Sequence, residues 1–398
     1  MAIGHLDADC FYVSAERVRD EWLEHRPVAV LGNNGACVIA RSYEMRECGI
    51  RTGEPIWDAV KSCPEGIYLK RDFAWYEVLS RQMLNIVRDI SPLVEYYSID
   101  EFFWLAKSQS SPVALRDRIK KETGLPVTVA LARTRTLAKL FAETVKPFGA
   151  IEVLTPEHEK QLLSELPITA VAGIGGRRAA RLAPYGVRTC LDLIHMPRSV
   201  VRSILTITGE RIWWELQGRP AMPIQNQKPP AQTISRGGGF TATDDPAVIY
   251  AWTVRHLERL IEELNFHEVR AGKLSLWIEY RDVASGLGEV SLDSATDRFD
   301  LLLDACRDAL RMAWRPGMKA SRIDLTATGL RGPGLIQRTL FEPESDPRKE
   351  AIFDLKRKVN AEMGRFTLRS GATLPLSELY RDPSCNYDIC DVRGKICF

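Results

Sequence analysis

The order of predicted secondary structure between residues 233 and 329 restricts the fold of this chain more than any other feature. Segments of strand length, apolar or alternating, are separated twice by longer segments with helical periodicity. In chain order they predict a strand, a helix, two strands, a helix and a strand: 233–241, 246–265, 272–281, 288–292, 298–314 and 322–329. This β-α-β-β-α-β order with an internal pseudo-repeat is typical of a ferredoxin-like domain.

The chain of 398 residues is too long for that domain alone, and at roughly 100–200 residues per domain we expect two to four. Residues 167–218 predict helices only, and 225–232, with two adjacent prolines, predict a linker. A further helix is expected at 348–363. The first 165 residues mix both element types, with strands at 2–6 and 27–31 and helices at 11–23, 38–47 and 76–90.

Composition excludes some classes of protein. No run of eighteen apolar residues and no basic-then-apolar leader is present, so we expect a soluble, cytoplasmic protein without a membrane partner. The nine cysteines form no CxxC pair, which favours reduced thiols. Cys385, Cys390 and Cys397 lie near one another, but no histidine is close and their spacing fits no zinc pattern.

Charge is distributed unevenly along the chain. The net charge is only +2, yet residues 166–230 hold nine Lys or Arg against three Asp or Glu. Such a basic block is typical of a surface that follows a phosphate backbone. The alternative is a solvated face without a partner.

Three carboxylates, Asp7, Asp100 and Glu101, lie at or beside the ends of short apolar segments. Asp7 follows the strand 2–6, and the adjacent pair lies inside 93–105, which predicts a hairpin with the acids at or beside its turn. If these strands are neighbours, the acids converge and their repulsion requires cations. Such hard oxygen ligands suit Mg²⁺, and two ions support in-line phosphoryl transfer. The alternative is a set of solvated strand ends.

A second cluster is basic. Tyr43 and Arg46 are three residues apart on a predicted helix and share a face. Lys139 and Lys146 are seven apart on a predicted helix 137–146, which Pro147 ends, and also share a face. Each cation alone is more often a surface residue than a ligand. Together with the three acids, the group matches a nucleoside triphosphate and its metals.

Four segments then resemble, in order and spacing, the successive motifs of the Y-family DNA polymerases: residues 6–12, 37–46, 97–101 and 146–149. The resemblance covers essentially the whole chain. Residues 33–41 and 364–371 are more similar to the UmuC branch, the catalytic subunit of DNA polymerase V, than to the DinB branch.

The resemblance implies a multidomain α+β fold shaped as a right hand, and it implies domain limits. The palm would comprise residues 1–17 and 72–165, and the fingers 18–71. The helical thumb would be 166–230 and the β-α-β-β-α-β little finger 231–332. Residues 333–398 would form a C-terminal tail.

It also implies roles for residues. Asp7, Asp100 and Glu101, with the Ala8 carbonyl, would bind two Mg²⁺ ions. The triphosphate of a dNTP would contact Tyr43, Arg46 and Lys146, with Lys139 as a further candidate. Tyr12 would be the steric gate under the sugar, where a 2′-hydroxyl would lie; its alternative role is a core aromatic.

DNA and partner contacts follow from the same resemblance. In the thumb, Gly173-Ile174-Gly175 resembles a helix-hairpin-helix, where glycines allow backbone N–H groups to approach phosphates, with Arg177 beside them. Ser235 and Arg236 are further phosphate contacts. Beyond the little finger, Gln337, Leu340 and Phe341 resemble the peptide that docks on the bacterial sliding clamp, or else pack on the chain itself.

The implied function is template-directed DNA synthesis past damaged bases, by two-metal transfer of a nucleotide from dNTP to a primer 3′-hydroxyl. UmuD-like and RecA-like proteins are possible partners in an SOS response. One competing hypothesis is a polymerase-like scaffold that binds DNA and clamp without chemistry, but such a protein loses metal carboxylates. Another is a nucleotide cyclase on the same palm, which has no use for a basic thumb.

Overall fold

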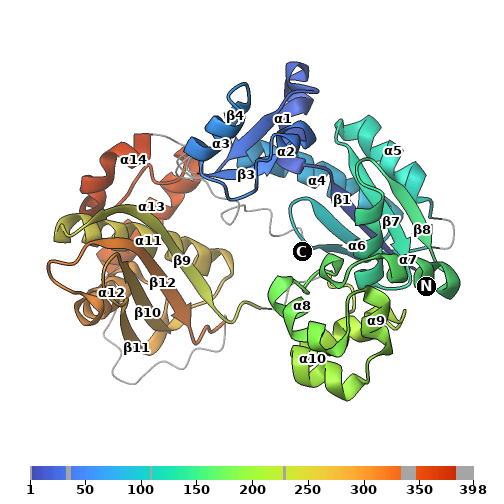
Figure 1. Ribbon diagram of the computed structural model, residues 1–398. Coiled ribbons are helices and arrows are strands. Elements are labelled where there is room, and N and C mark those ends of the chain that lie inside the picture. Colours follow the sequence, from blue (N-terminus) through green and yellow to red (C-terminus); the bar gives the residue numbers. More distant parts are fainter. Residues whose placement is uncertain (1, 33–36, 108–109, 227–229, 333–346, 382–398) are drawn as a thin grey trace. The chain divides into compact units, whose positions relative to one another are not determined.

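The computed structural model describes residues 2–32, 37–107, 110–226, 230–332 and 347–381 (Figure 1). The chain divides into two compact units, with the boundary between Lys228 and Pro229. This boundary lies inside the predicted linker 225–232. Among the described residues, no helix has both the length and the apolar character that crossing a membrane requires.

A five-stranded sheet forms the centre of the first unit, in the order β5-β6-β1-β7-β8. Strand β1 is central and pairs antiparallel with both β6 and β7. The strands are β1 (Ala2–Ala8), β5 (Val94–Tyr96), β6 (Glu101–Ala106), β7 (Val127–Ala132) and β8 (Ala150–Val153). The predicted first strand and the hairpin at 93–105 are thereby confirmed.

Three helices pack against this sheet: α4 (Phe73–Ile90), α5 (Pro112–Thr123) and α6 (Arg135–Thr144). A fourth helix, α1 (Phe11–Arg19), contacts α4. The predicted helix 76–90 is confirmed in α4, and the predicted helix 11–23 ends earlier, at Arg19, with one 3-10 turn at Glu21–Leu23. Asp20 accounts for this break, because its side chain accepts a hydrogen bond from the backbone of Trp22 and caps the turn.

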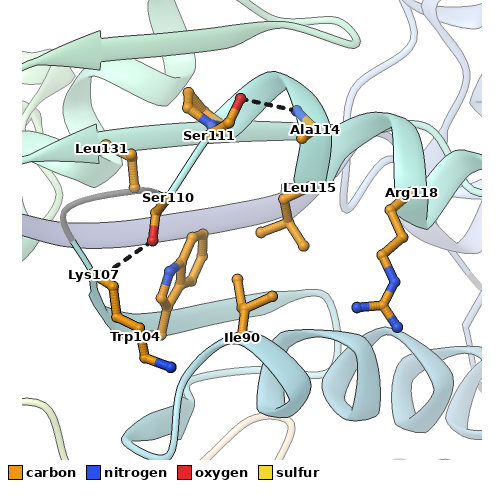
Figure 2. A pocket seen from close by; sticks show the side chains of 10 residues that line it. Ile90, Trp104, Lys107, Ser110, Ser111, Ala114, Leu115, Arg118 and Leu131 are labelled. Atoms are coloured by element: carbon orange, nitrogen blue, oxygen red, sulfur yellow. Dashed lines mark hydrogen bonds between the residues drawn. The ribbon is translucent and has the colours of Figure 1, made fainter.

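A cavity of about 600 Å³ lies beside α4 and α5 (Figure 2). Trp104 of β6, Ile90 of α4, Leu115 of α5 and Leu131 of β7 line it. Trp104 and Glu101 are three residues apart on one strand and so point to opposite faces of the sheet. The cavity is therefore on the face that the carboxylates do not occupy.

A smaller, three-stranded sheet in the order β3-β2-β4 lies in the same unit. It is covered by two short helices around a core that includes Ala29, Val38 and Met45. The elements are β2 (Val28–Leu31), β3 (Val38–Arg41), α2 (Tyr43–Glu47), α3 (Ile56–Ser62) and β4 (Ile67–Lys70).

The prediction of one helix over 38–47 is wrong. Residues 38–41 form strand β3 because they pair with β2, with Ala29 opposite Arg41. The helix begins only after Ser42, whose hydroxyl accepts a hydrogen bond from the Met45 amide at 3.1 Å. A segment of four residues is too short for its hydrophobic periodicity to distinguish a strand from a helix. Pairing with β2 makes these residues a strand.

Residues 156–216 are helical, which confirms the prediction for 167–218. The helices are α7 (Pro156–Glu165), α8 (Gly176–Leu182), α9 (Cys190–His195) and α10 (Arg198–Leu216), with 3-10 turns at Ile168–Ala170 and Ala183–Tyr185. Helix α10 contains a break at Thr206, where φ is 64° and ψ is −170°. These helices share one apolar core with α6 of the sheet region.

The side chain of Glu215, near the end of α10, connects these helices to the sheet region. It is fully buried. One carboxylate oxygen accepts a hydrogen bond from the Thr136 amide at 3.1 Å, and the other accepts from the amides of Ala221 and Met222 at 2.7 and 2.9 Å. The Glu215 carbonyl accepts from the Thr134 hydroxyl at 2.9 Å. One residue therefore satisfies donors from two segments, the start of α6 and the chain that follows α10.

The second unit confirms the β-α-β-β-α-β order element by element. Its antiparallel sheet has the order β11-β10-β12-β9. The two β-α-β halves are therefore interleaved: β12 lies between β9 and β10, and β10 lies between β11 and β12. The elements are β9 (Ile234–Thr243), α11 (Pro246–Phe266), β10 (Ala271–Tyr280), β11 (Gly286–Thr296), α12 (Phe299–Ala313) and β12 (Ala320–Thr328).

The tail adds helix α13 (Pro347–Met363), which confirms the prediction for 348–363. It is followed by a 3-10 helix, Gly371–Leu376, that packs against α11, and by α14 (Ser377–Arg381). Within this unit the Ser370 amide donates a hydrogen bond of 2.8 Å to the buried Glu258 of α11. The described part of the tail is thus joined to the second unit.

We expect Glu215→Ala to lower the free energy of unfolding of the first unit by about 3 kcal/mol, because three backbone N–H groups lose their acceptor. Glu215→Gln keeps one acceptor oxygen and should lose clearly less. Urea denaturation followed by tryptophan fluorescence measures both variants against the wild type. Equal losses in the two variants would contradict the assignment.

Candidate active site

Pairing of β1 with β6 brings the three predicted carboxylates together. Asp7 and Glu101 stand opposite each other in the register, and Asp100 immediately precedes β6. The Ala8 amide donates a hydrogen bond of 3.0 Å to the Asp100 carbonyl, which holds the end of β1 against the hairpin. The expectation that these acids converge at one edge of the sheet therefore agrees with the structure.

Burial and the neighbouring Asp7 raise the proton affinity of Asp100 and Glu101. Burial and then the neighbouring Asp7 raise the pKa of Glu101 to about 7, against the lowering effect of Lys139. Burial also raises the pKa of Asp100, although a hydrogen bond from Ser98 opposes it. Carboxylates this close to one another need nearby positive charge to stay ionised. The oxygens of the three acids are hard donors, which suit divalent cations of the Mg²⁺ type.

Both predicted lysines reach this cluster. The Lys139 ammonium, on α6, forms an ion pair with Glu101. The Lys146 ammonium lies 2.9 Å from Asp7 and 2.6 Å from Glu143. Burial lowers the pKa of Lys146, but Asp7 and Glu143 outweigh it and raise the pKa above its usual value.

The prediction that Lys146 lies on the same helix as Lys139 is wrong. Helix α6 ends at Thr144, Val145 is its C-cap, and Lys146 belongs to the following turn. The proline at 147 explains the difference, because a residue before proline is disfavoured in the α conformation. Lys146 reaches Asp7 from this turn, so the two lysines approach the acids from different segments.

Asp9 is a site residue that sequence reasoning missed. Its carboxylate is buried and accepts hydrogen bonds from the Thr128 hydroxyl at 3.0 Å and the Phe148 amide at 2.7 Å. Burial raises the pKa of Asp9 to about 6, although both hydrogen bonds lower it. Asp9 thereby holds the turn that carries Lys146 against the end of β1. The sequence feature that could have indicated Asp9 is its position as a second acid two residues after Asp7.

Tyr43 and Arg46 share a face of α2, as predicted. The Arg46 guanidinium lies 4.5 Å from the centre of the Tyr43 ring and donates a hydrogen bond of 3.3 Å to Cys10. Cys10 lies two residues after the end of β1, so this part of α2 lies near the acids. Burial and then Asp9 raise the pKa of the Tyr43 hydroxyl, which therefore stays protonated and able to donate.

Tyr12, on α1, is half-buried in an aromatic group. Its ring stacks on Tyr76 with centroids 4.7 Å apart, and the Phe73 ring lies 5.7 Å away. Tyr76 is fixed in turn by a hydrogen bond of 2.6 Å from its hydroxyl to Glu16. Tyr12 is thus held in one orientation by a rigid neighbour while part of its ring stays accessible.

The Gly-rich segment in the helical region forms a tight turn. Gly173 has φ of +91° and is exposed, whereas Ile174 is fully buried. Gly175 is the N-cap of α8, and a side chain there would meet no atom within 4 Å. Arg177 on α8 is exposed. Part of the basic charge is neutralised elsewhere, since Arg198 and Arg202 both pair with Glu210.

The two predicted phosphate contacts in the second unit have partners within that unit. The Ser235 hydroxyl donates a hydrogen bond of 3.0 Å to the Leu325 carbonyl. The Arg236 guanidinium lies 2.5 Å from Glu263, and its side chain is 11% exposed. The predicted clamp residues Gln337, Leu340 and Phe341, and the three tail cysteines, lie outside the described residues.

Two family models match the chain. One is the impB/mucB/samB family, at residues 6–143, and the other is the C-terminal domain of that family, at 231–340. The first match includes the three acids, Tyr12, α2 and Lys139, and ends before Lys146. Together the two matches cover more than half of the chain.

Relatives from bacteria match along most of their length. Protein ImpB of Salmonella typhimurium is 31% identical, covering 87% of this chain and 86% of the relative. DNA polymerase IV of Bacillus velezensis is 28% identical, covering 94% of each. Protein UmuC of Salmonella typhimurium is 27% identical, covering 91% of each. These identities are too close together to separate the branches of the family.

Solved structures show the same fold. A chimera of the Y-family DNA polymerases Dbh and Dpo4 has a TM-score of 0.70 and 21% identity, covering 83% of this chain and all of that one. An insertion ternary complex of Dbh DNA polymerase has a TM-score of 0.58 and 21% identity, covering 82% of this chain and 98% of that one. The chain therefore belongs to the impB/mucB/samB family and has the fold of the Y-family DNA polymerases.

Proposed function

We propose that this protein is a DNA-directed DNA polymerase that copies damaged template by transferring a nucleotide from dNTP to a primer 3′-hydroxyl. The convergence of Asp7, Asp100 and Glu101 at one edge of the sheet is the observation that supports this proposal most. A scaffold without chemistry would not need three adjacent carboxylates, one buried and two partly buried, that repel one another. A nucleotide cyclase would not need the helical region or the second unit.

The same carboxylates, with the Ala8 carbonyl, would hold two Mg²⁺ ions. When bound, such ions activate an attacking hydroxyl and stabilise a leaving oxygen in phosphoryl transfer. The chain itself places the acids by strand pairing, fixes the Asp100 side chain through Ser98, and excludes water from most of the Asp7 carboxylate, which is 9% exposed.

Four residues would bind the triphosphate. Lys139 and Lys146 offer ammonium groups, Arg46 a guanidinium, and Tyr43 a protonated hydroxyl. They come from α6, from the turn after it and from α2, and so surround the acids on more than one side. Charge-assisted hydrogen bonds to phosphate oxygens are the strong kind, which suits a substrate with several negative charges.

The sheets and helices of each region support domain limits as part of this proposal. The five-stranded sheet fits a palm of residues 1–17 and 72–165, and the three-stranded sheet fits fingers of 18–71. The helical region fits a thumb of 166–230, and the second unit fits a little finger of 231–332 followed by a tail.

Primer-template DNA would contact the thumb through Gly173, Gly175 and Arg177, and the little finger through Ser235 and Arg236. The Arg236 contact requires its pair with Glu263 to open, so we rank it below the thumb contacts. Because the substrate is DNA, we place the protein in a bacterial cytoplasm. A sliding clamp bound by Gln337, Leu340 and Phe341, and UmuD-like and RecA-like partners, belong to the proposal on family resemblance alone.

We expect Asp7→Ala and Asp100→Ala each to abolish primer extension while leaving primer-template affinity nearly unchanged, because the acids serve chemistry and DNA binds mainly through other regions. Asp117→Ala, on the exposed face of α5, is the matched control and should retain activity. Extension assays with each variant, and fluorescence anisotropy for DNA binding, provide the measurements. More than a few per cent of wild-type extension in either variant would refute the metal assignment.

For Tyr12 we expect the alanine variant to incorporate ribonucleotides at least about tenfold more readily relative to deoxynucleotides, since it removes a clash and not a reacting group. Tyr12→Phe keeps the ring and should retain the discrimination. Single-nucleotide incorporation with rNTP and dNTP measures the ratio. Unchanged discrimination in Tyr12→Ala would show that the residue serves the core only.

In the thumb, we expect Arg177→Ala with Arg181→Ala to weaken DNA binding to a similar extent on every sequence. The slope of log affinity against log salt should become shallower by about 1 to 2. Both side chains are exposed on α8. Arg118→Ala, on α5, is the control because Arg118 pairs with Glu122 and Asp89. An unchanged slope in the double variant would remove α8 from the DNA surface.

A further inference from the structure

Two cysteines that are fifteen residues apart in sequence meet in the three-stranded-sheet region. Cys48 is the C-cap of α2, and Cys63 is the C-cap of α3. Their sulfur atoms lie 3.0 Å apart. Cys63 belongs to the apolar core of this region and is fully buried, whereas Cys48 packs against that core and is partly accessible.

The positions of both cysteines are fixed by backbone hydrogen bonds. The Cys48 amide donates to the Glu44 carbonyl at 3.3 Å, and the Cys63 amide donates to the Ala59 carbonyl at 2.9 Å. The Cys63 carbonyl accepts from the Tyr68 hydroxyl at 3.0 Å. The backbone at both helix ends therefore holds the two thiols close together.

A shared metal ion is the first alternative, because Glu65 also lies near the pair. Tetrahedral zinc with Zn–S bonds of about 2.3 Å holds two thiolates about 3.8 Å apart. The observed separation of 3.0 Å is too short for that geometry. A structural zinc site also uses four protein ligands. Among the described residues, the group here consists of the two cysteines and the exposed Glu65.

A disulfide needs only a small further approach, since its S–S bond is about 2.05 Å. We propose that Cys48 and Cys63 form a reversible disulfide under oxidation by a hydroperoxide, and that this bridge joins the end of α2 to the end of α3. The site is a modification site in the region that we assign to the fingers. The proposal differs from the sequence-based expectation of reduced thiols at these two cysteines.

The chemistry balances with hydrogen peroxide as the oxidant. The more accessible Cys48 sulfur attacks one peroxide oxygen, the O–O bond breaks, and sulfenic acid and water result. The Cys63 sulfur then attacks the sulfenic sulfur, the S–OH bond breaks, and the Cys63 proton leaves with the hydroxyl as a second water. Burial and the adjacent Cys48 raise the pKa of Cys63 to about 12, so the buried Cys63 is a poor nucleophile toward peroxide. Its place 3.0 Å from Cys48 assigns it to the second step, in which its proton leaves as its sulfur attacks.

The bridge has a consequence for the nucleotide, and this part rests on the proposed function. Helix α2 carries Tyr43 and Arg46 and spans only five residues. Closing the sulfur separation draws the end of α2 toward α3 by up to about 1 Å, and displacements of that size change binding and catalysis. We expect the oxidised protein to bind dNTP with a KM about fivefold higher than the reduced protein.

The cross-link can be measured without any activity assay. After treatment of the full chain with hydrogen peroxide and blocking of free thiols with N-ethylmaleimide, trypsin releases residues 47–51 and 62–70, each with one cysteine. We expect these two peptides joined, with a mass two hydrogens below their sum, and separated again by dithiothreitol. Cys48→Ser and Cys63→Ser should abolish the joined species, and Cys190→Ser, which alters another buried cysteine, should retain it.

Stability gives a second readout that does not depend on polymerase activity. The oxidised wild type should melt several degrees above the reduced form, with no such shift in either serine variant, because the bridge closes a loop in the unfolded chain. Blocked thiols on both peptides after peroxide, or tight zinc uptake that protects both cysteines, would overturn the proposal. A joined peptide with unchanged dNTP KM would overturn the coupling to α2 and leave the proposed polymerase function intact.

Discussion

The mutual repulsion of Asp7, Asp100 and Glu101, at one end of the central strands, is the constraint on which the rest of the first unit depends. Antiparallel pairing fixes Asp7 opposite Glu101, and the hairpin before β6 adds Asp100. Such a group is stable only with positive charge nearby, and the chain supplies it from Lys139 and Lys146. Asp9 has a separate task, because its buried carboxylate fixes the turn from which Lys146 extends.

Helix α6 joins this cluster to the helical region. One face of α6 belongs to the apolar core that α8, α9 and α10 share, and Lys139 extends from the same helix to Glu101. At its start, the Thr134 hydroxyl caps the helix and donates to the Glu215 carbonyl. The helix that aligns an ammonium group with the acids is thus also a helix on which the helical region packs, so a shift of that region reaches the cluster through α6.

Much of the fold and of the site could be predicted from the sequence, wherever a hydrophobic pattern extends over many residues or neighbouring residues alone determine the structure. The β-α-β-β-α-β unit has long periodic segments, and the acids adjoin short apolar segments: Asp7 lies near the end of β1, and Asp100 and Glu101 lie at the start of β6. Prediction failed at residues 38–41, where a partner strand decided between strand and helix, and at Lys146, where proline ended the helix earlier. The pairing of Arg236 with Glu263 and of Cys48 with Cys63 joins distant residues and leaves no local signal.

The positions of Lys139 and Lys146 have a thermodynamic consequence. Each ammonium group faces a carboxylate that also has the chemistry of a cation ligand, so the lysine and a divalent ion compete for the same oxygen atoms. In the proposed polymerase, an ammonium that yields its carboxylate would regain a partner in a phosphate oxygen of the nucleotide. The affinities for ion and triphosphate would then be linked, and by reciprocity each would raise the other by the same factor. A site that holds only the ion or only the nucleotide would be less stable than the empty site or the site that holds both.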